Sequence, residues 1–256
     1  MIESFLLYNG DIELTFNPGN HQYRVVLTKT GKKFKPDSVT RICGIIDKSG
    51  PLINWAINNT IDYIRSGIQP GVEHSEAFLE EIYAIAKRES QRKKTEAADR
   101  GTIVHNVLSG VLQESDDSGV LEESISLKVR HAKEWLKENQ VEFIHIERPI
   151  YSRRYRYSGR LDGIGRIGGR LSLLDWKTGK GMYPEFRLQT AAYNHAYEEE
   201  IGEEEIFQRV ILHLTEEACI PHYYPRNTLR QDFSAFCGAQ RLHNQIKAIE
   251  KAERHG

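Results

Sequence analysis

The chain has 256 residues, of which 39% are hydrophobic, and its formal net charge is −1. A chain of this size can bury a sizeable core as one large domain or as a domain with an appendage. No apolar run reaches the roughly 18 residues of a membrane-spanning helix, and the N-terminal stretch lacks the basic region of a secretory signal. Three scattered cysteines without a CxxC spacing fit a reducing compartment. We therefore expect a cytoplasmic protein with no membrane partner.

The first half of the chain predicts a hairpin followed by helices. Apolar and polar residues alternate over 12–35 around Asn17-Pro18-Gly19-Asn20, a pattern typical of a β-hairpin. A helix beginning at Ser38 or Thr40 should reach Ile46. Apolar periodicity and capping residues predict further helices over residues 51–64, 76–94, 98–114 and 122–139.

From Val141 onward the pattern changes to strands. Three strands are predicted over residues 142–152, 155–166 and 170–177. They are followed by a helix over 184–199, strands over 207–214 and 219–224, and a helix over 228–253. This order predicts an α/β fold in which a central mixed β-sheet is flanked by helices.

Two of these strands carry acidic residues that a hairpin would bring together. Asp162 lies in Gly159-Arg160-Leu161-Asp162-Gly163, and Asp175 and Lys177 lie in Leu174-Asp175-Trp176-Lys177-Thr178-Gly179. The intervening Gly168-Gly169 pair predicts a tight turn that places the strands side by side. Asp175 and Lys177 are two residues apart, so both leave the same face. Two carboxylates and an ammonium in one place can bind a hard cation and assist phosphodiester hydrolysis.

Each residue also has an ordinary structural interpretation. An Asp and a Lys two apart on a strand usually form a solvated edge. His105 lies on an otherwise apolar helix, where a histidine more often packs in the core than binds a metal. Gln189 and Tyr193 share one helix face at spacing i, i+4 and could simply pack there. Their joint occurrence in this order around the acidic strands favours a functional site.

In this arrangement the chain resembles the PD-(D/E)XK nuclease superfamily, in particular its RecB-type branch. That branch combines GxxD and DxK strands with an upstream helix histidine and a downstream Q-x-x-x-Y helix. The segment Ser38-Val39-Thr40-Arg41-Ile42 is also similar to the lead-in of phage exonucleases and of the mitochondrial genome maintenance exonuclease. The resemblance implies a restriction-endonuclease-like core. Residues 1–35 would then be a β-hairpin extension, and 36–256 a nuclease domain with a helical lead-in.

The resemblance also implies a role for each site residue. Lys177 would orient or activate the attacking water, and Gln189 and Tyr193 would position the lysine and the DNA backbone. Glu147 would bind a second metal or serve its strand structurally. The implied ligands of Mg²⁺ or Mn²⁺ are Asp162, Asp175, His105 and the backbone carbonyl of Trp176.

Arginines and tyrosines crowd the hairpin that carries Asp162. They could bind successive phosphates and stack on bases. Alternatively, they could belong to an exposed strand on which the aliphatic parts of the arginine side chains cover the sheet. The candidate DNA-binding residues are Arg153, Arg154, Arg156, Tyr157 and Arg160.

The resemblance extends to cofactors and partners. Relatives with an iron–sulfur cluster hold it with four cysteines, and this chain has three, so we expect no cluster. There is no Walker loop, so a helicase partner would be a separate polypeptide, as would a recombinase or a single-strand-binding protein.

The sequence therefore predicts a metal-dependent DNA exonuclease that acts on strand ends and prefers single-stranded DNA. Its setting would be phage, recombination or repair DNA processing, in a bacterial or phage-infected cell. Two alternatives stay open. One is a structure-specific or restriction-type endonuclease of the same fold, and the other is a non-catalytic DNA-binding subunit.

Overall fold

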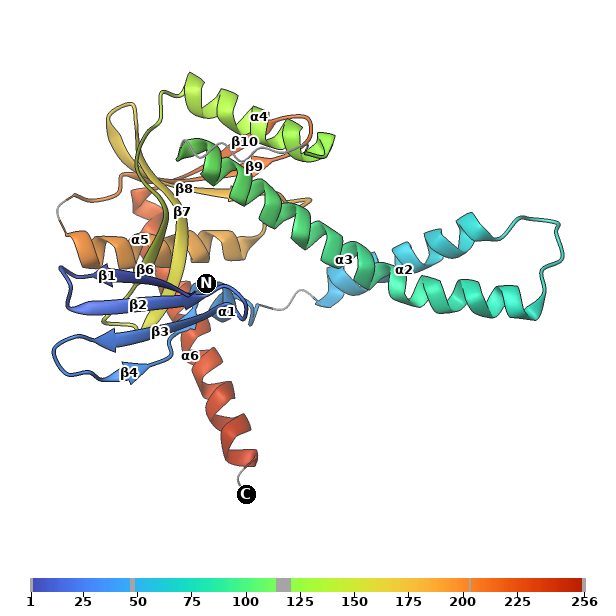
Figure 1. Cartoon of the computed structure of the whole chain (residues 1–256), viewed down its shortest axis with the longest axis horizontal. Coiled ribbons are helices and arrows are strands. Elements are labelled where there is room, and N and C mark those ends of the chain that lie inside the picture. Colours follow the sequence, from blue (N-terminus) through green and yellow to red (C-terminus); the bar gives the residue numbers. More distant parts are fainter. Residues whose placement is uncertain (1, 47–48, 114–120, 203, 255–256) are drawn as a thin grey trace. The chain divides into compact units, whose positions relative to one another are not determined.

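The computed structural model describes residues 2–46, 49–113, 121–202 and 204–254 (Figure 1). The chain groups into two compact units, which we call the sheet unit (Met1–Ile46 with Val104–Gly256) and the helical unit (Asp47–Ile103). The expected division of the chain after residue 35 stays a prediction. All the predicted site residues belong to the sheet unit.

The sheet unit is built on a six-stranded mixed sheet in the order β10-β9-β8-β7-β5, with β6 also paired to β7. The pairs β6–β7, β7–β8 and β9–β10 are antiparallel, whereas β8–β9 and β5–β7 are parallel. The strands are β5 (Asp37–Ser38), β6 (Glu142–Tyr151), β7 (Tyr157–Ile167), β8 (Arg170–Lys177), β9 (Gln208–Leu214) and β10 (Cys219–Pro225). This confirms the predicted α/β fold with a mixed central sheet.

The turn between β7 and β8 forms where the glycine pair predicts it. Ile167 pairs with Arg170, so the connection has two residues, Gly168 and Gly169. Their φ angles are +56° and +75°, in the left-handed region that glycine enters without a steric penalty. The turn therefore fixes the register that brings the two acidic strands side by side.

Helices cover both faces of this sheet (Figure 1). On one face, α1 (Val39–Cys43), α5 (Pro184–Ile201) and α6 (Leu229–Glu253) form a core with β7 and β8 that includes Leu173. On the other, α4 (Glu123–Glu138) and the last turns of α3 (Glu76–Leu112) pack on β8 and β9 in a core that includes Leu174. Successive β8 residues thus leave opposite faces, as strand geometry requires. A short 3₁₀ turn, Arg226–Thr228, precedes α6.

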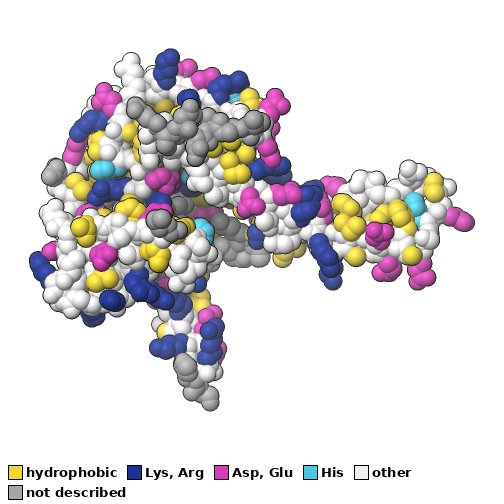
Figure 2. Space-filling view, viewed as in Figure 1, with side chains coloured by type: hydrophobic (Ala, Val, Ile, Leu, Met, Phe, Trp, Pro, Cys, Tyr) yellow, Lys and Arg dark blue, Asp and Glu magenta, His cyan; other side chains and the backbone are white. Residues whose placement is uncertain are grey.

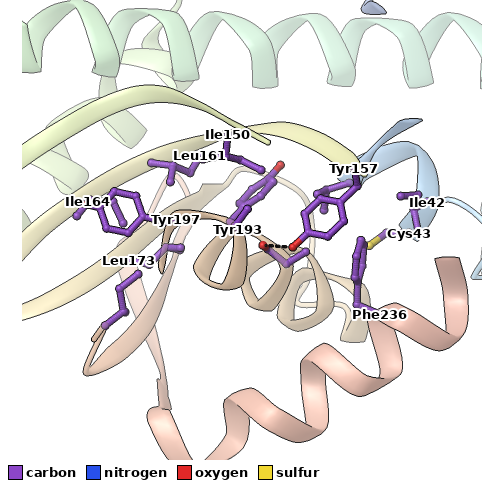
Figure 3. Packing of buried hydrophobic residues seen from close by; sticks show 14 of the residues in the cluster. Ile42, Cys43, Ile150, Tyr157, Leu161, Ile164, Leu173, Tyr193, Tyr197 and Phe236 are labelled. Carbon is purple, nitrogen blue, oxygen red and sulfur yellow. Dashed lines mark hydrogen bonds between the residues drawn. The ribbon is translucent and has the colours of Figure 1, made fainter. Parts of the chain in front are cut away.

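Aromatic side chains pack in the core that α1, α5 and α6 form with the sheet. Figure 3 shows Tyr157 of β7 beside Phe236 of α6, and their ring centroids lie 4.9 Å apart. The Tyr157 hydroxyl donates a hydrogen bond of 2.8 Å to the Ala192 carbonyl of α5. A buried tyrosine needs such a partner, and this bond ties β7 to α5.

A second, four-stranded antiparallel sheet, which we call the N-terminal sheet, comes before this core in the chain. Its strands follow chain order: β1 (Glu3–Leu7), β2 (Ile12–Asn17), β3 (Gln22–Leu27) and β4 (Lys33–Phe34). The β2–β3 pair is the predicted hairpin, and β1 and β4 add a strand on each side of it. The buried side chains of this sheet, among them Ile12 and Leu14, pack against Tyr151 of β6.

The helical unit consists of α2 (Ser49–Gly67) and the N-terminal part of α3. Lys93 donates to the Asn59 side chain at 3.0 Å, which joins the two helices. Ile53, Ile57 and Ile61 follow one another at i, i+4 and are 40–56% exposed. Figure 2 shows hydrophobic side chains gathered on the helical unit.

The break predicted between residues 94 and 98 does not occur, because α3 is one continuous helix. No glycine or proline lies there, and Arg92 binds both Glu89 and Glu96, bridging the region with i, i+3 and i, i+4 ion pairs. The loop expected at residues 115–119 lies outside the described residues. Within the described chain, we find no helix with the length and apolar character needed to cross a bilayer.

Candidate metal centre and active site

Glu147 of β6, Asp162 of β7 and Asp175 of β8 lie side by side on three neighbouring strands, at a point where the regular strand pairing is interrupted. The β6–β7 register pairs Ile146 with Gly163 and Arg148 with Leu161, and it skips Glu147 and Asp162 between them. The β7–β8 ladder ends at Gly163 and Leu174, one position before Asp162 and Asp175. Glu147 has a φ of +52°. A left-handed conformation costs a non-glycine residue roughly 1–3 kcal/mol and is concentrated at functional sites.

The distortion frees the carboxylate of Asp162 to bond to the next strand. Asp162 is 8% exposed, and its Oδ2 accepts a hydrogen bond of 2.8 Å from the backbone N–H of Trp176. The side chain thus satisfies a donor that the strand ladder leaves free at this point. Its other oxygen, Oδ1, lies 3.7 Å from Nδ1 of His105.

The C-terminal part of α3 presents two side chains to this row. His105 and Ser109 are four residues apart and share a helix face. The Ser109 hydroxyl donates to Oε1 of Glu147 at 2.9 Å. One ligand atom from each of His105, Glu147 and Asp162 lies within 4.8 Å of the others. An imidazole nitrogen and two carboxylate oxygens in this arrangement suit Mg²⁺ or Mn²⁺.

Asp175 and Lys177 form an ion pair on β8. Nζ of Lys177 lies 2.6 Å from Oδ2 of Asp175, which confirms that the two side chains share a face. Asp175 is fully buried, and among the described residues its carboxylate oxygens have no hydrogen-bond donor besides this ammonium. Nζ also lies 5.1 Å from the centroid of the Phe186 ring of α5.

The electrostatics of the cluster favour a cation. Burial raises the pKa of Asp175 to about 6, although Lys177 opposes the shift. Burial and the charge of Asp162 raise the pKa of Glu147. Burial also pushes the pKa of Asp162 upward, but His105 and Lys177 outweigh it and the net shift is downward. Burial lowers the pKa of His105, but the Asp162 carboxylate outweighs it, so the net shift is upward.

Three carboxylates therefore share the site with one lysine and one histidine. Unpaired buried negative charge is costly, and a divalent cation among the carboxylates offsets that cost. The donor set fits a metal, as does Oδ1 of Asp175, which has no partner among the described residues.

Gln189 and Tyr193 meet on α5. The Gln189 amide donates to the Tyr193 hydroxyl at 2.8 Å, and Tyr193 is 3% exposed. Burial holds the pKa of Tyr193 well above its usual value, so the hydroxyl stays neutral. Among the described residues these two side chains bond to each other and not to Lys177.

Tyr193 needs a glycine opposite it. A Cβ on Gly159 would lie 2.7 Å from Cε1 of the Tyr193 ring, so we expect Gly159→Ala to destabilise the protein by about 1–3 kcal/mol through overpacking. Denaturant unfolding measures the change. Gly179→Ala is the matched control, because a Cβ there meets no atom within 4 Å. Equal losses for the two variants would contradict this account.

The five predicted DNA-binding residues separate into different environments. Tyr157 is fully buried and bonded to α5, so the prediction that it stacks on a base is wrong. It points into the core that α5 and α6 form with β7, not onto the surface. Arg160 binds Glu3 and lies 5.0 Å from the Phe16 ring centroid. Arg153, Arg154 and Arg156 lie in or beside the β6–β7 turn.

Of the metal ligands that the family resemblance implies, His105 and Asp162 lie close together in the structure, and Glu147 lies beside them. Asp175 is paired with Lys177 instead, and Trp176 contributes its N–H to Asp162. Sequence reasoning missed Ser109, although its i, i+4 spacing from His105 was a usable signal.

Neither protein-family models nor curated proteins match this chain. Among solved structures, an alkaline exonuclease (LHK-Exo) from Laribacter hongkongensis is similar over 78% of this chain and 98% of its own, with 9% identity and a TM-score of 0.30. The crystal structure of SSO0001 covers 45% of this chain, with 16% identity and a TM-score of 0.24. The similar part spans 59% of that protein. Both likenesses are weak, so the functional interpretation depends on the geometry of the site.

Proposed function

We propose that this protein is a metal-dependent nuclease that hydrolyses DNA from strand ends, with a preference for single strands. The observation that supports the proposal is the partly buried cluster of His105, Glu147 and Asp162 beside the Asp175–Lys177 pair. A binding module has little use for three carboxylates, two of them buried, next to a lysine. The proposed setting is DNA processing in phage growth, recombination or repair.

His105, Glu147 and Asp162 would hold Mg²⁺ or Mn²⁺. Bound there, the ion supplies Lewis-acid stabilisation of phosphate charge and lowers the pKa of a water molecule. The protein's own part is to fix these donors. Asp162 is held by the Trp176 N–H and Glu147 by the Ser109 hydroxyl. Such supporting bonds commonly change metal affinity or activity by about 10- to 100-fold.

Lys177 would act directly on the reacting groups. Asp175 holds its ammonium in one place, and the neighbouring carboxylates keep it protonated, because their charges outweigh the effect of burial and raise its pKa. A protonated amine can donate to the attacking water and to a phosphate oxygen whose charge grows during the reaction. Gln189 and Tyr193, which are bonded to each other, would position the lysine and the DNA backbone.

Digestion of end-labelled DNA tests the proposal. Linear single strands, linear duplexes and covalently closed circles are incubated with Mg²⁺, Mn²⁺ or EDTA. We expect linear single strands to be degraded only with a divalent ion, and circles to stay intact. Cutting of circles would instead make the protein an endonuclease. Binding of DNA without any metal-dependent cleavage would overturn the enzymatic proposal and leave a DNA-binding subunit.

A further inference from the structure

We infer that a pocket beside the N-terminal sheet binds one nucleotide of a nucleic-acid strand, its phosphate and its base together, away from the bond that is cut. This inference rests on the proposed function and identifies a second contact with the same substrate. The pocket has a volume of about 370 Å³ and lies between the β3–β4 turn and the β6–β7 turn. Its lining includes Lys29, Lys32, Phe34, Arg153 and Arg156.

The charge of the pocket suits a phosphate. Four cationic side chains line it together with a single carboxylate, that of Asp11. Asp11 is already bound by Lys29 at 2.9 Å and by Arg153 at 3.1 Å, and the bond from Lys29 contributes most to lowering its pKa. Lys32 and Arg156 have no carboxylate partner within the described ranges. Their positive charges therefore remain available to an anion, and arginine in particular binds phosphate oxygens in pairs.

One wall of the pocket is aromatic. The Phe34 ring is partly exposed and lies 5.9 Å from the buried Tyr151 ring, centroid to centroid. The Arg156 guanidinium lies 6.0 Å from the centroid of the Phe34 ring. A base stacked on Phe34 would place its own phosphate beside Arg156, a combination used by proteins that bind single strands. Figure 2 shows Lys and Arg side chains along the part of the N-terminal sheet where Figure 1 places β3 and β4.

The turn that carries the arginines is held rigidly. The Arg156 N–H donates to the Ser152 carbonyl at 2.8 Å, and the Arg154 N–H donates to the Glu199 carboxylate at 3.0 Å. Arg156 itself has a φ of +58°, a conformation that other bonds must maintain in a non-glycine residue. The backbone that carries Arg153 and Arg156 is therefore fixed before any ligand arrives, which reduces the entropic cost of binding.

The pocket and the metal cluster are connected by β6. Tyr151 in the pocket wall lies four residues after Glu147, or roughly 13 Å along a strand at about 3.3 Å per residue. A strand cut at the cluster could therefore place a neighbouring nucleotide in the pocket. This continuity favours a nucleotide within a strand over a free mononucleotide, although both present the same chemistry.

Binding measured in EDTA tests the inference without cleavage. Fluorescence anisotropy of a labelled single-stranded oligonucleotide would compare the wild type with the double variant Lys32→Ala/Arg156→Ala. The control is Arg130→Ala/Lys133→Ala, which removes the same charge from exposed positions of α4. We expect the pocket variant to bind about tenfold more weakly or worse. The slope of log affinity against log salt should become shallower by about 0.7 for each phosphate that the variant no longer binds. The control should bind like the wild type.

Further variants separate the parts of the inference. Phe34→Leu keeps an apolar side chain but removes the stacking surface, and it should weaken binding about tenfold. Lys32→Gln, on an exposed turn, repeats the charge test with little risk to folding. Equal affinities of the pocket and control double variants would overturn the inference. Competition by a free mononucleotide as effective as that by the oligonucleotide would overturn the assignment to a strand. Because EDTA prevents turnover, these outcomes are independent of whether the protein cleaves DNA.

Discussion

Lys177→Ala is expected to lower metal-dependent DNA cleavage by about 10²–10³-fold, the usual effect of removing one group that stabilises transition-state charge. The ammonium lies 2.6 Å from Asp175 and beside the cluster of His105, Glu147 and Asp162. It is the only lysine or arginine that the described structure holds against these carboxylates in an ion pair. Binding of DNA should persist, because the rest of the sheet unit is unchanged.

The measurement is initial-rate cleavage of a labelled single strand, with affinity determined in parallel in EDTA. Lys133→Ala removes an exposed lysine from α4 and should retain full activity. Lys177→Met keeps the aliphatic stem and separates packing from charge. It should be as inactive as Lys177→Ala if the charge matters. A Lys177→Ala protein that cleaves at the wild-type rate would exclude Lys177 from the reaction.

Local patterns explain why much of the sheet could be predicted. Gly168-Gly169 specifies a two-residue turn by its backbone freedom alone, and this turn fixes the β7–β8 register. The shared face of Asp175 and Lys177 follows from the strand period of two. These features depend on neighbouring residues, so the sequence carries them directly.

Other features depend on long-range packing and could not be predicted in this way. Glu147 meets Ser109 across 38 residues, through a helix that packs on the sheet only in the folded protein. The left-handed φ of Glu147 has no local cause such as glycine, so it reflects the surrounding structure. In sequence Tyr157 resembles a surface aromatic among arginines, but its position on β7 faces α5. The continuity of α3 is not evident from sequence, because charge pairs are equally typical of a solvated segment.

The distinction between the two aspartates shows the same limit. From spacing alone, Asp162 and Asp175 are equivalent. In the structure, Asp162 belongs to the cluster with His105 and Glu147, whereas Asp175 holds Lys177. Asp162 accepts the Trp176 N–H and lies beside His105, whereas Asp175 meets only the Lys177 ammonium among the described residues. The spacing of the two aspartates does not reveal these different partners.

Asp162→Asn should abolish the stabilisation that Mn²⁺ or Mg²⁺ gives to the protein. A ligand that binds only the folded state at about 100 times its Kd stabilises by about 2.7 kcal/mol, or roughly 5–10 °C in Tm for a chain of this size. The asparagine oxygen can still accept the Trp176 N–H, so the variant tests the charge of Asp162 and not its structural bond. Cleavage should fall by at least about 10²-fold, since metal stabilisation of phosphate charge amounts to several kcal/mol.

Thermal unfolding with and without each ion measures the effect. Glu134→Gln removes an exposed carboxylate from α4 and should keep the full metal-dependent shift. A shift that survives in Asp162→Asn would place the metal elsewhere, whereas a wild type that shows no shift with either ion would refute the metal site. Loss of the shift in Asp162→Asn but not in Lys177→Ala would separate the two halves of the site. His105, Glu147 and Asp162 would then bind the ion, and Lys177 would act on the water and the phosphate.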